Sequence, residues 1–288
     1  MTEQTLACPV CRAVLTQNAN NLRCAAGHSF DRARQGYWNL LLAHKKRSKD
    51  PGDNAAMVQA RRDFLDQGYY QPLSDAVNNM AISSLKDIHQ PKVMDMGCGE
   101  GYYTERLHTA LVENSNHESN PQAPPPLVSA LDISKHAVKA ACRRTKAVQW
   151  MVASGADMPL PDDSQDLLCV LFSRLMPEPF AKVLKPGAHL LIAWPGEDHL
   201  IELRREIYDE IRPSRFDPIA QLSEQFSLVE QQQVRVPFTL QRPEDIQALL
   251  GMTPHSQRMA ADKRARLDAM KSLPLTLDVN LALLRKIA

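Results

Sequence analysis

Residues 92–107, which read KVMDMGCGEGYYTERL, decide the fold of this chain of 288 residues. A short apolar run, VMDM, ends in a turn that contains Gly97, Gly99 and Gly101, and a helical pattern follows over Gly101–Leu111. Glycine allows the backbone to turn sharply and to approach a bound molecule closely. The segment therefore predicts a strand, a ligand-binding turn and a helix in direct succession.

Strands and helices continue to alternate on the carboxyl side of this segment. Further strands are predicted at VSALDIS, VQWMVA, DLLCVLF and HLLIAW, with helices between them at Lys135–Thr145 and at PEPFAKVL. Such alternation predicts right-handed crossovers and a parallel sheet, so the fold class is α/β. After a predicted helix at His199–Ile211, two alternating apolar segments, Leu228–Leu240 and Leu275–Ile287, suit an antiparallel edge pair.

Two helices and one insertion complete the predicted elements. Apolar residues that are three and four positions apart predict helices at Ala55–Gln67 and Tyr70–Leu85. Residues 113–126, ENSNHESNPQAPPP, are polar and rich in proline, so they predict a flexible surface insertion after the helix of the glycine turn.

The first 28 residues contain the spacing of a zinc site, Cys8-x2-Cys11-x12-Cys24-x3-His28. Zinc prefers four thiolate or imidazole ligands at the corners of a tetrahedron, and a complete set of four protein ligands indicates a structural site. A module of roughly 30 residues buries too little core to be stable alone, so a metal crosslink explains how it folds. A redox CxxC motif is the alternative, but it would not need Cys24 and His28.

Composition excludes several classes of protein. A hydrophobic content of 44% and a charged content of 23% indicate a sizeable folded core and exclude a disordered chain. No apolar run approaches the roughly 20 residues of a membrane-spanning helix, and the N-terminal residues lack the pattern of a secretory signal. The six cysteines are too scattered for a disulfide framework. We therefore expect a cytoplasmic protein without a membrane segment.

The net charge of +1 hides a strong asymmetry along the chain. Residues 1–62 hold ten Lys or Arg against four Asp or Glu, a net of +6, so the remainder carries −5. A basic N-terminal region on an acidic body predicts a local surface for a polyanion, with an ordinary solvated face as the alternative. The candidate phosphate contacts are Lys45, Lys46, Arg47, Lys49, Arg61 and Arg62. Trp38 could stack on an RNA base, but packing between the two modules is favoured.

Acidic residues surround the glycine turn. Asp95 precedes the first glycine and Glu100 lies inside the turn, so a pyrophosphate would be repelled. A cationic sulfonium ligand that carries an amino group would instead be favoured. Asp132 ends the next predicted strand, where an acid can accept hydrogen bonds from both ribose hydroxyls, and Ile133 follows it into the same pocket.

Three further residues are candidates for the same ligand. Asp157 follows the third predicted strand and could accept a hydrogen bond from an adenine amino group, with Met158 against the adenine face. Helix capping or solvation is the alternative for Asp157. Tyr102, at the start of the helix after the turn, could line the cofactor, although helix packing explains it equally well.

The stretches DMGCGEG, LDIS, SGADMPLP and LKPGAHLLIAWPG together resemble the successive motifs of class I, Rossmann-like methyltransferases over about residues 90–200. The resemblance implies S-adenosylmethionine as the cofactor. It also implies a mostly parallel seven-stranded sheet whose last two strands form an antiparallel pair. That arrangement agrees with the two alternating segments near the C-terminus.

The whole chain is similar to the bacterial 23S rRNA guanine-N1 methyltransferases, the RlmA family. Stretches outside the shared core carry this assignment, notably CPVC, CAAGHSFDRARQGYWNLL and HKKRSKDPGDNAAMVQARRDFLDQGYYQPL. The resemblance implies methylation of guanine N1 in a 23S rRNA hairpin, RNA recognition by a zinc domain, and a homodimer. DPGDNAAMVQARRDFLD favours the Gram-negative subgroup, one of two that modify neighbouring guanines.

We expect three parts in the chain: a zinc-binding RNA-recognition module (1–36), a basic linker with helices (37–90) and the methyltransferase domain (91–288). Guanine N1 carries a proton and lies on the Watson–Crick edge, so the base must be extruded and deprotonated. Residues 171–177, LFSRLMP, lack the signature of exocyclic amino methylation, which leaves ring-nitrogen methylation compatible. Arg174 is a candidate for stabilising the deprotonated base, with a surface contact as the alternative. No residue is identified as the general base.

Two other functions use the same core. A small-molecule methyltransferase would share the cofactor pocket, but it would not need a zinc module or a basic N-terminal region. A noncatalytic RNA-binding protein could retain the pocket without transferring a methyl group. To test the metal site, we expect the Cys24→Ser change to release zinc and weaken RNA binding while cofactor affinity is largely kept.

Overall fold

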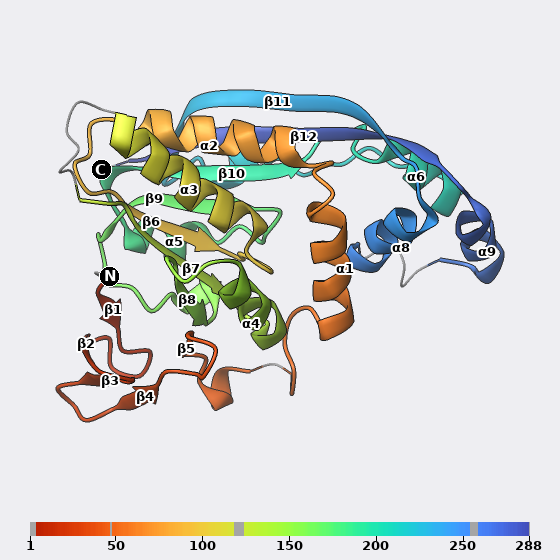
Figure 1. Ribbon diagram of the computed structural model, residues 1–288. Coiled ribbons are helices and arrows are strands. Elements are labelled where there is room, and N and C mark those ends of the chain that lie inside the picture. Colours follow the sequence, from red (N-terminus) through yellow and green to blue (C-terminus); the bar gives the residue numbers. More distant parts are fainter. Residues whose placement is uncertain (1–3, 47, 118–123, 254–258, 288) are drawn as a thin grey trace.

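The computed structural model describes residues 4–46, 48–117, 124–253 and 259–287. An eight-stranded sheet forms the centre of the molecule (Figure 1). In spatial order its strands are β11 (Phe226–Leu240), β12 (Leu273–Lys286), β10 (Leu184–Pro195), β9 (Gln165–Leu171), β6 (Lys92–Met96), β7 (Leu127–Asp132), β8 (Gln149–Val152) and β5 (Trp38–Asn39).

Strand β12 is antiparallel to both of its neighbours, and every other pair of neighbouring strands in this sheet is parallel. The expected parallel sheet with an antiparallel edge pair is therefore confirmed. The short strand β5 pairs with β8 and adds an eighth strand to the expected seven. A run of two residues is too short to be recognised from periodicity.

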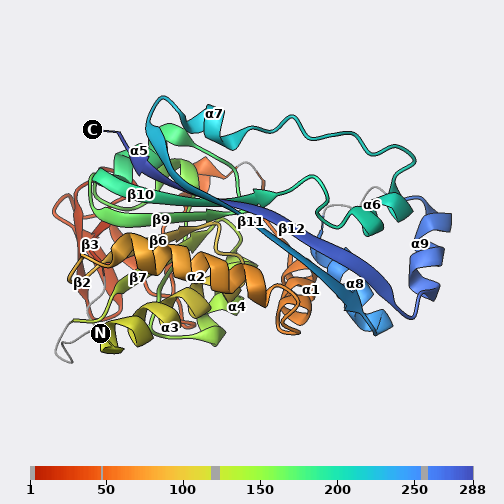
Figure 2. The ribbon, with the colours of Figure 1, turned by 90° about the horizontal axis from the view of Figure 1, so that it is seen from above.

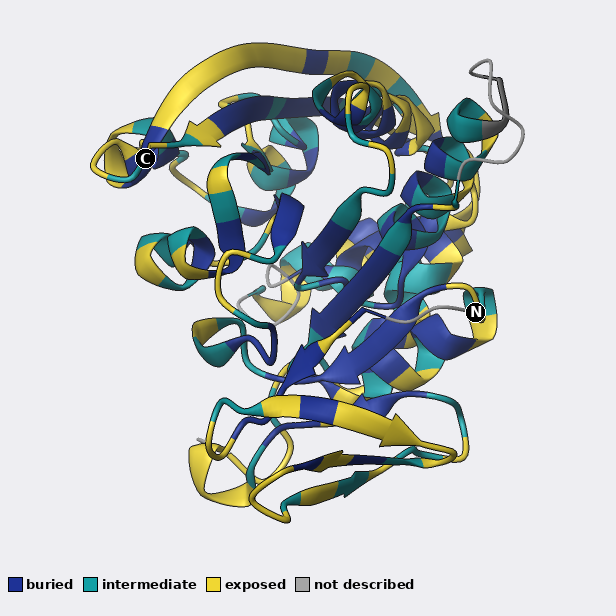
Figure 3. Ribbon diagram, turned by 90° about the vertical axis from the view of Figure 1, so that its left-hand side faces the viewer, coloured by how far each residue is buried: buried dark blue, intermediate teal, exposed yellow. Residues whose placement is uncertain are grey.

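Two apolar cores cover the two faces of the sheet, because successive side chains of a strand point to opposite sides. Val93 belongs to the core under the helices α2 (Gln71–Leu85), α3 (Tyr102–His117) and α4 (Lys135–Arg144). Its neighbour Met94 belongs to the other core, which also contains residues of α5 (Pro177–Val183) and of the N-terminal module. Figures 2 and 3 show these layers; the central strands are buried over most of their length.

The N-terminal module is a four-stranded antiparallel sheet, hereafter the ribbon, which packs against the main sheet (Figure 3). Gln4 donates hydrogen bonds from Nε2 to the carbonyl oxygens of Val93 (3.0 Å) and Leu127 (2.6 Å). The backbone N–H of Ala7 donates to the carbonyl of Pro159 over 2.9 Å. The ribbon is thus fixed to the main sheet and is not a separate arm. Its strands are β1 (Leu6–Ala7), β2 (Val14–Asn18), β3 (Asn21–Cys24) and β4 (Ser29–Asp31).

Trp38 lies where the ribbon meets the main sheet and is fully buried. The guanidinium of Arg32 lies 5.3 Å from the centre of its ring. A buried indole cannot stack on an RNA base, so the expected packing role is confirmed.

A helical group lies beyond the carboxyl ends of the parallel strands (Figure 1). Helix α1 packs against α8, and α8 packs against α9. The long β11–β12 pair reaches this group and carries α8 and α9 between its strands. No helix within the described ranges is long and apolar enough to cross a bilayer. The bounds of these elements are α1 (Ala55–Leu65), α6 (Ile201–Ile207), α7 (Pro218–Leu222), α8 (Pro243–Met252) and α9 (Ala261–Ala269).

Two predicted boundaries are wrong. The helix expected over His199–Ile211 begins only at Ile201 and ends at Ile207, because Leu200 has a left-handed backbone and Tyr208 is already extended. Helix α3 continues to His117, so it includes the first residues of the expected insertion 113–126. Residues 118–123 of that insertion lie outside the described part of the chain.

Candidate active site and metal centre

The four predicted zinc ligands meet at one end of the ribbon. Cys8 and Cys11 lie in the turn between β1 and β2, whereas Cys24 ends β3 and His28 precedes β4. Their ligand atoms all lie within 4.8 Å of one another, and the Sγ atoms of Cys11 and Cys24 are 3.7 Å apart. A tetrahedron with zinc–sulfur bonds of about 2.3 Å separates its sulfurs by about 3.8 Å. The donor set and its spacing therefore fit zinc, which this ribbon binds.

The chemistry of Cys24 also suits a metal ligand, because the thiolate is the form that binds zinc. Burial alone would raise the pKa of the Cys24 thiol, but hydrogen bonds from the backbone and ring of His28 outweigh it and lower the pKa to about 6. His28 directs Nδ1 toward the sulfurs, at 3.4 Å from Cys24 Sγ and 3.7 Å from Cys8 Sγ. Nδ1 is thus its ligand atom.

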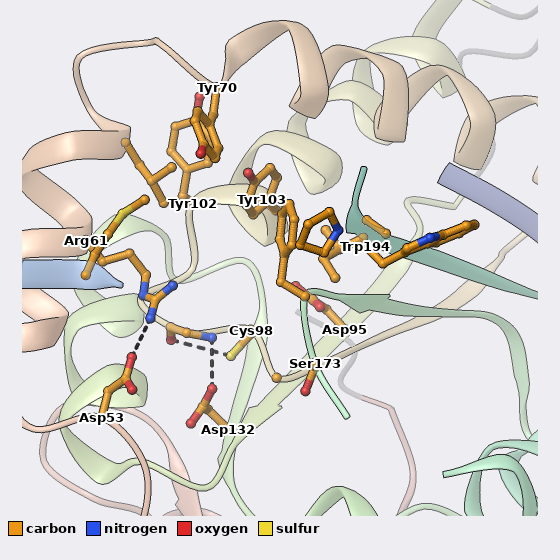
Figure 4. A pocket seen from close by; sticks show the side chains of 18 of the residues that line it. Asp53, Arg61, Tyr70, Asp95, Cys98, Tyr102, Tyr103, Asp132, Ser173 and Trp194 are labelled. Carbon is orange, nitrogen blue, oxygen red and sulfur yellow. Dashed lines mark hydrogen bonds and ion pairs between the residues drawn. The ribbon is translucent and has the colours of Figure 1, made fainter. Parts of the chain in front are cut away.

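A cavity of about 690 Å³ opens at the carboxyl ends of β6, β7, β9 and β10, and the glycine turn forms part of its wall (Figure 4). Gly97, Gly99 and Gly101 have φ values of 83°, 55° and 89°, a region that favours glycine. A Cβ atom on Gly101 would lie 2.9 Å from both Ala141 and Trp150. The third glycine therefore allows close packing behind the turn, while the first two form the wall.

Asp132 holds the glycine turn in place from the neighbouring strand. Its carboxylate accepts hydrogen bonds from the backbone N–H groups of Gly99 (3.0 Å) and Ser134 (2.7 Å). Burial raises the pKa of Asp132, although these two hydrogen bonds oppose the shift. An ionised carboxylate at this position is also able to accept the two hydroxyls of a ribose, and that contact stays a prediction.

Asp95 lies deeper in the same cavity and is only 3% exposed. Thr104 donates a hydrogen bond of 2.5 Å to its carboxylate. Burial raises the pKa of Asp95 to about 6, the Thr104 hydrogen bond opposes this, and the nearby charge of Asp132 adds to it. Two buried acids beside one cavity favour a ligand that brings positive charge and hydrogen-bond donors.

Glu100 and Tyr102 line the cavity as expected, but both also pack against Arg144. Arg144 Nε lies 2.5 Å from the Glu100 carboxylate, and its guanidinium lies 5.6 Å from the centre of the Tyr102 ring. Burial raises the pKa of Glu100 against the opposing effect of Arg144. Oε1 of Glu100 is buried without a hydrogen-bond partner among the described residues, so it can accept from a ligand.

The structure does not bring Asp157, Met158 or Ile133 to the lining of the cavity. Asp157 forms ion pairs with Arg12 (3.4 Å) and with Lys45. Met158 is buried in the core on the ribbon side of the sheet. Ile133 packs beneath the chain at Gly52, where a Cβ atom would lie only 3.0 Å from its Cγ2. The adenine contacts that we expected for Asp157 and Met158 are therefore not formed by this arrangement.

The predicted RNA-binding residues do not form one free basic surface. Lys46 and Lys49 are exposed on the linker, and Arg47 lies outside the described residues. Lys45 is held by Asp157, and Arg62 lies 3.5 Å from Asp66. Arg61 is part of the cavity wall, where it forms a 2.6 Å ion pair with Asp53 (Figure 4). Helix α1 thus turns Arg61 toward the cofactor cavity, which corrects its expected place on the RNA surface.

Arg174, the candidate for charge stabilisation, is exposed and does not line the cavity. Its neighbours Phe172, Ser173 and Leu175 do line it. Phe172 has a left-handed backbone with φ of 53°, and its ring is 40% exposed. The segment after β9 therefore lines the cavity with Phe172, Ser173 and Leu175, and not with Arg174.

Sequence reasoning missed several ring-bearing residues that line the cavity, of which Figure 4 labels Tyr70 and Trp194. No shared spacing marks them, because each comes from a different place in the chain. The only local signal is the position of Trp194 at the end of a predicted strand, HLLIAW. These residues are Tyr70, Phe172, Trp194, His199 and Phe216; Tyr103, which directly follows Tyr102 after the glycine turn, lines the cavity as well.

We expect the Asp95→Asn variant to be more stable than the wild-type protein at pH 7.5 in the absence of ligand, by up to about 2 kcal/mol. The folded-state pKa of Asp95 is raised to about 6, above its usual 3.8. Its ionisation therefore destabilises the fold progressively as the pH rises through this window, and asparagine removes the penalty. Urea unfolding at pH 4 and pH 7.5 would measure the difference. A gain of equal size at both pH values would contradict the explanation.

The fold and the two buried acids at the glycine turn define a class I methyltransferase that uses S-adenosylmethionine. The chain matches the family model of the RlmA N-terminal zinc ribbon over residues 6–49 and a methyltransferase domain model over residues 94–192. The match to the RlmA family model confirms that the N-terminal module is a zinc ribbon.

Relatives match nearly the whole chain. It is 33% identical over 264 residues to the 23S rRNA (guanine(748)-N(1))-methyltransferase of Streptomyces fradiae, which covers 91% of this chain and 89% of the relative. It is 30% identical over 281 residues to a putative 23S rRNA (guanine-N(1)-)-methyltransferase of Bacillus subtilis (strain 168), with coverages of 95% and 94%. A similarly named protein of Micromonospora griseorubida is 34% identical over 230 residues, covering 74% and 72%. The chain belongs to the RlmA family of 23S rRNA guanine-N1 methyltransferases.

Proposed function

We propose that this protein methylates N1 of a guanine in a 23S rRNA hairpin. The observation that carries the proposal is the match to relatives named for this reaction over both the ribbon and the catalytic core. A small-molecule enzyme would need only the core. The linker stretch at residues 50–66 favours the Gram-negative subgroup for the choice between neighbouring guanines.

S-adenosylmethionine supplies an electrophilic methyl group on a sulfonium sulfur. We assign the ribose hydroxyls to Asp132 and the charged amino-acid part to Asp95 and the glycine turn, and the support is that all of them line the same cavity. Arg61 adds a cation to the same wall. The buried acids disfavour anionic ligands such as a dinucleotide pyrophosphate, which supports this cofactor over a nicotinamide nucleotide.

The acceptor must reach the cavity as a single unpaired base. Guanine N1 lies on the Watson–Crick edge and is hidden in a duplex, so extrusion of the base is required. The aromatic residues that line the cavity offer apolar and stacking surface for a flat heterocycle. This supports a nucleobase as the acceptor.

We further propose the division of the chain into a ribbon that recognises RNA (1–36), a basic linker with helices (37–90) and a catalytic domain (91–288). The exposed Lys46 and Lys49 would contact phosphates, which gives affinity that falls with salt. A homodimer and a cytoplasmic location, where rRNA is assembled, complete the proposal.

The test uses the purified full chain, labelled S-adenosylmethionine, unmodified 23S rRNA and a panel of metabolites. We expect label to enter the rRNA at one guanine and to stop reverse transcriptase there, because an N1-methyl group blocks base pairing. Label in a metabolite alone would support a small-molecule enzyme and reject the proposal. Binding of cofactor and RNA without transfer would indicate a noncatalytic RNA-binding protein.

A further inference from the structure

We propose that the Tyr103 hydroxyl contacts the Watson–Crick edge of the target guanine and stabilises the negative charge that develops there as N1 loses its proton. The inference rests on the proposed function and assigns a catalytic residue to it. Tyr103 lies at the start of α3, directly after the glycine turn, and its side chain lines the cavity (Figure 4).

The first support is the unpaired state of the hydroxyl. The Tyr103 oxygen is buried and has no hydrogen-bond partner among the described residues. A buried polar group left without a partner costs about 1–3 kcal/mol, which a phenylalanine would avoid while filling the same space. The presence of an unpaired hydroxyl in the cavity wall is explained if a bound ligand supplies the missing hydrogen-bond partner.

The second support is the protonation state. Burial raises the pKa of Tyr103 well above its usual range, and the neighbouring Tyr70 adds to the shift. The hydroxyl therefore remains a hydrogen-bond donor across the physiological range. A neutral donor stabilises an oxygen on which negative charge develops, and it does so most strongly in a cavity from which water is excluded.

The third support is the character of this part of the cavity. The acids Asp132 and Asp53 lie on the opposite side of it from Tyr70 and Tyr103 (Figure 4). The Tyr103 ring packs against the Tyr102 ring with centroids 5.1 Å apart, and Phe172, which also lines the cavity, stacks against His199 with centroids 6.2 Å apart. A non-glycine residue with a left-handed backbone costs about 1–3 kcal/mol, and at functional sites such strain is often part of the design. The strained Phe172 presents a flat apolar surface that suits a base.

Tyr70 offers a second donor beside Tyr103. The backbone N–H of Asp278 donates to His199 Nδ1 over 3.3 Å, so the hydrogen of a neutral His199 ring is on Nε2. Nε2 lies 3.3 Å from the Tyr70 hydroxyl and donates to its oxygen. The Tyr70 hydroxyl keeps its own hydrogen for a ligand. His199 thus positions Tyr70, whose side chain lines the same cavity as Tyr103.

The reaction balances with these groups. The N1–H proton leaves to solvent, and negative charge spreads over N1 and the O6 oxygen, which accepts from the phenol. The N1 electron pair forms the bond to the methyl carbon, the carbon–sulfur pair stays on sulfur, and a neutral thioether remains. Tyr103 itself neither gains nor loses a proton.

The test compares the Tyr103→Phe variant with the wild-type protein on the rRNA substrate. At pH 7 we expect kcat to fall about 100-fold, the size seen when one donor to a developing oxyanion is removed. The affinity for S-adenosylmethionine, measured by calorimetry, should change by less than about 2-fold. The reason is that the Tyr103 hydroxyl bonds to the guanine and not to the cofactor. The deficit in kcat should shrink as the pH rises toward the range in which guanine N1 ionises unaided.

The matched control is Tyr37→Phe, which removes another buried phenol hydroxyl from a residue that does not line the cavity. Its kcat should remain close to the wild-type value. A deficit of Tyr103→Phe that is constant across pH would overturn the inference. So would weakened cofactor affinity with a normal kcat at saturating cofactor, which would assign the hydroxyl to the cofactor. If the wild-type protein methylates no rRNA, the proposed function fails instead.

Discussion

Asp132→Ala is expected to weaken S-adenosylmethionine binding at least about 100-fold, because it removes two roles at once. The carboxylate accepts the N–H groups of Gly99 and Ser134, so it fixes the shape of the glycine turn. It is also the acceptor placed for the ribose hydroxyls. Hydrogen bonds to a charged group contribute about 1.5–3 kcal/mol each, and the loss of two accounts for the expected factor. Calorimetric titration with the cofactor measures it.

One further variant of Asp132 and one control variant complete the test. Asp132→Asn keeps one acceptor oxygen and is expected to lose about 10-fold in affinity, between the alanine variant and the wild type. Glu178→Ala removes an exposed acid that does not line the cavity and should leave the affinity unchanged. If Asp132→Ala bound the cofactor within about 3-fold of the wild type, the ribose would have to lie elsewhere.

The strands of the catalytic core were predictable from sequence because their apolar runs and the glycine turn are local signals. Asp95 and Asp132 were predictable for the same reason, since each ends a parallel strand and such ends meet at one edge of a sheet. The zinc ligands follow from spacing alone. In each case the signal that identifies the residue lies within a short stretch of the chain.

Asp157 shows where such reasoning fails. Its place after the third strand of the core suggested an adenine contact, yet Arg12 and Lys45 from the N-terminal region occupy its carboxylate. The prediction for Arg61 is wrong in the opposite sense. Its basic surroundings in the sequence suggested an RNA contact, but α1 brings the side chain to Asp53 at the cofactor cavity. Pairings between residues so far apart in sequence depend on how modules dock, and no periodicity records that. The aromatic lining was missed for the same reason.

Removal of zinc is expected to destabilise the whole protein and not only the ribbon. We expect Cys24→Ser to lose the metal and to lower the melting temperature by more than about 10 °C, since structural zinc contributes on the order of 10 kcal/mol to the folding of such modules. The destabilisation extends to the whole protein because the ribbon shares a core with the central sheet. Leu6, Leu15 and Leu22 of the ribbon belong to the same core as Met94 of the central sheet.

Arg12 connects the metal centre directly to the catalytic domain. It follows Cys11 in the turn that holds two of the ligands, and its backbone is left-handed with φ of 64°. Its guanidinium donates to the carbonyl oxygens of Met158 (2.8 Å) and Leu160 (2.7 Å). Loss of zinc would release this side chain from the loop after β8. Because Met158 and Leu160 do not line the cavity, we still expect the cofactor affinity of Cys24→Ser to change by less than about 2-fold, while the loss of this anchor adds to the loss of stability.

Four measurements on Cys24→Ser decide between these effects: zinc content by mass spectrometry, the melting temperature, the affinity for cofactor and the affinity for rRNA. Cys142→Ser is the matched control, because Cys142 is a buried cysteine of α4 outside the metal cluster. Arg12→Ala should keep the zinc but reproduce part of the fall in melting temperature, which separates the anchor from the metal. A Cys24→Ser protein that melts like the control would show that the ribbon needs no metal. Unchanged rRNA affinity in a zinc-free protein would remove the ribbon from RNA recognition, and the exposed linker lysines would then have to supply the grip on phosphate by themselves.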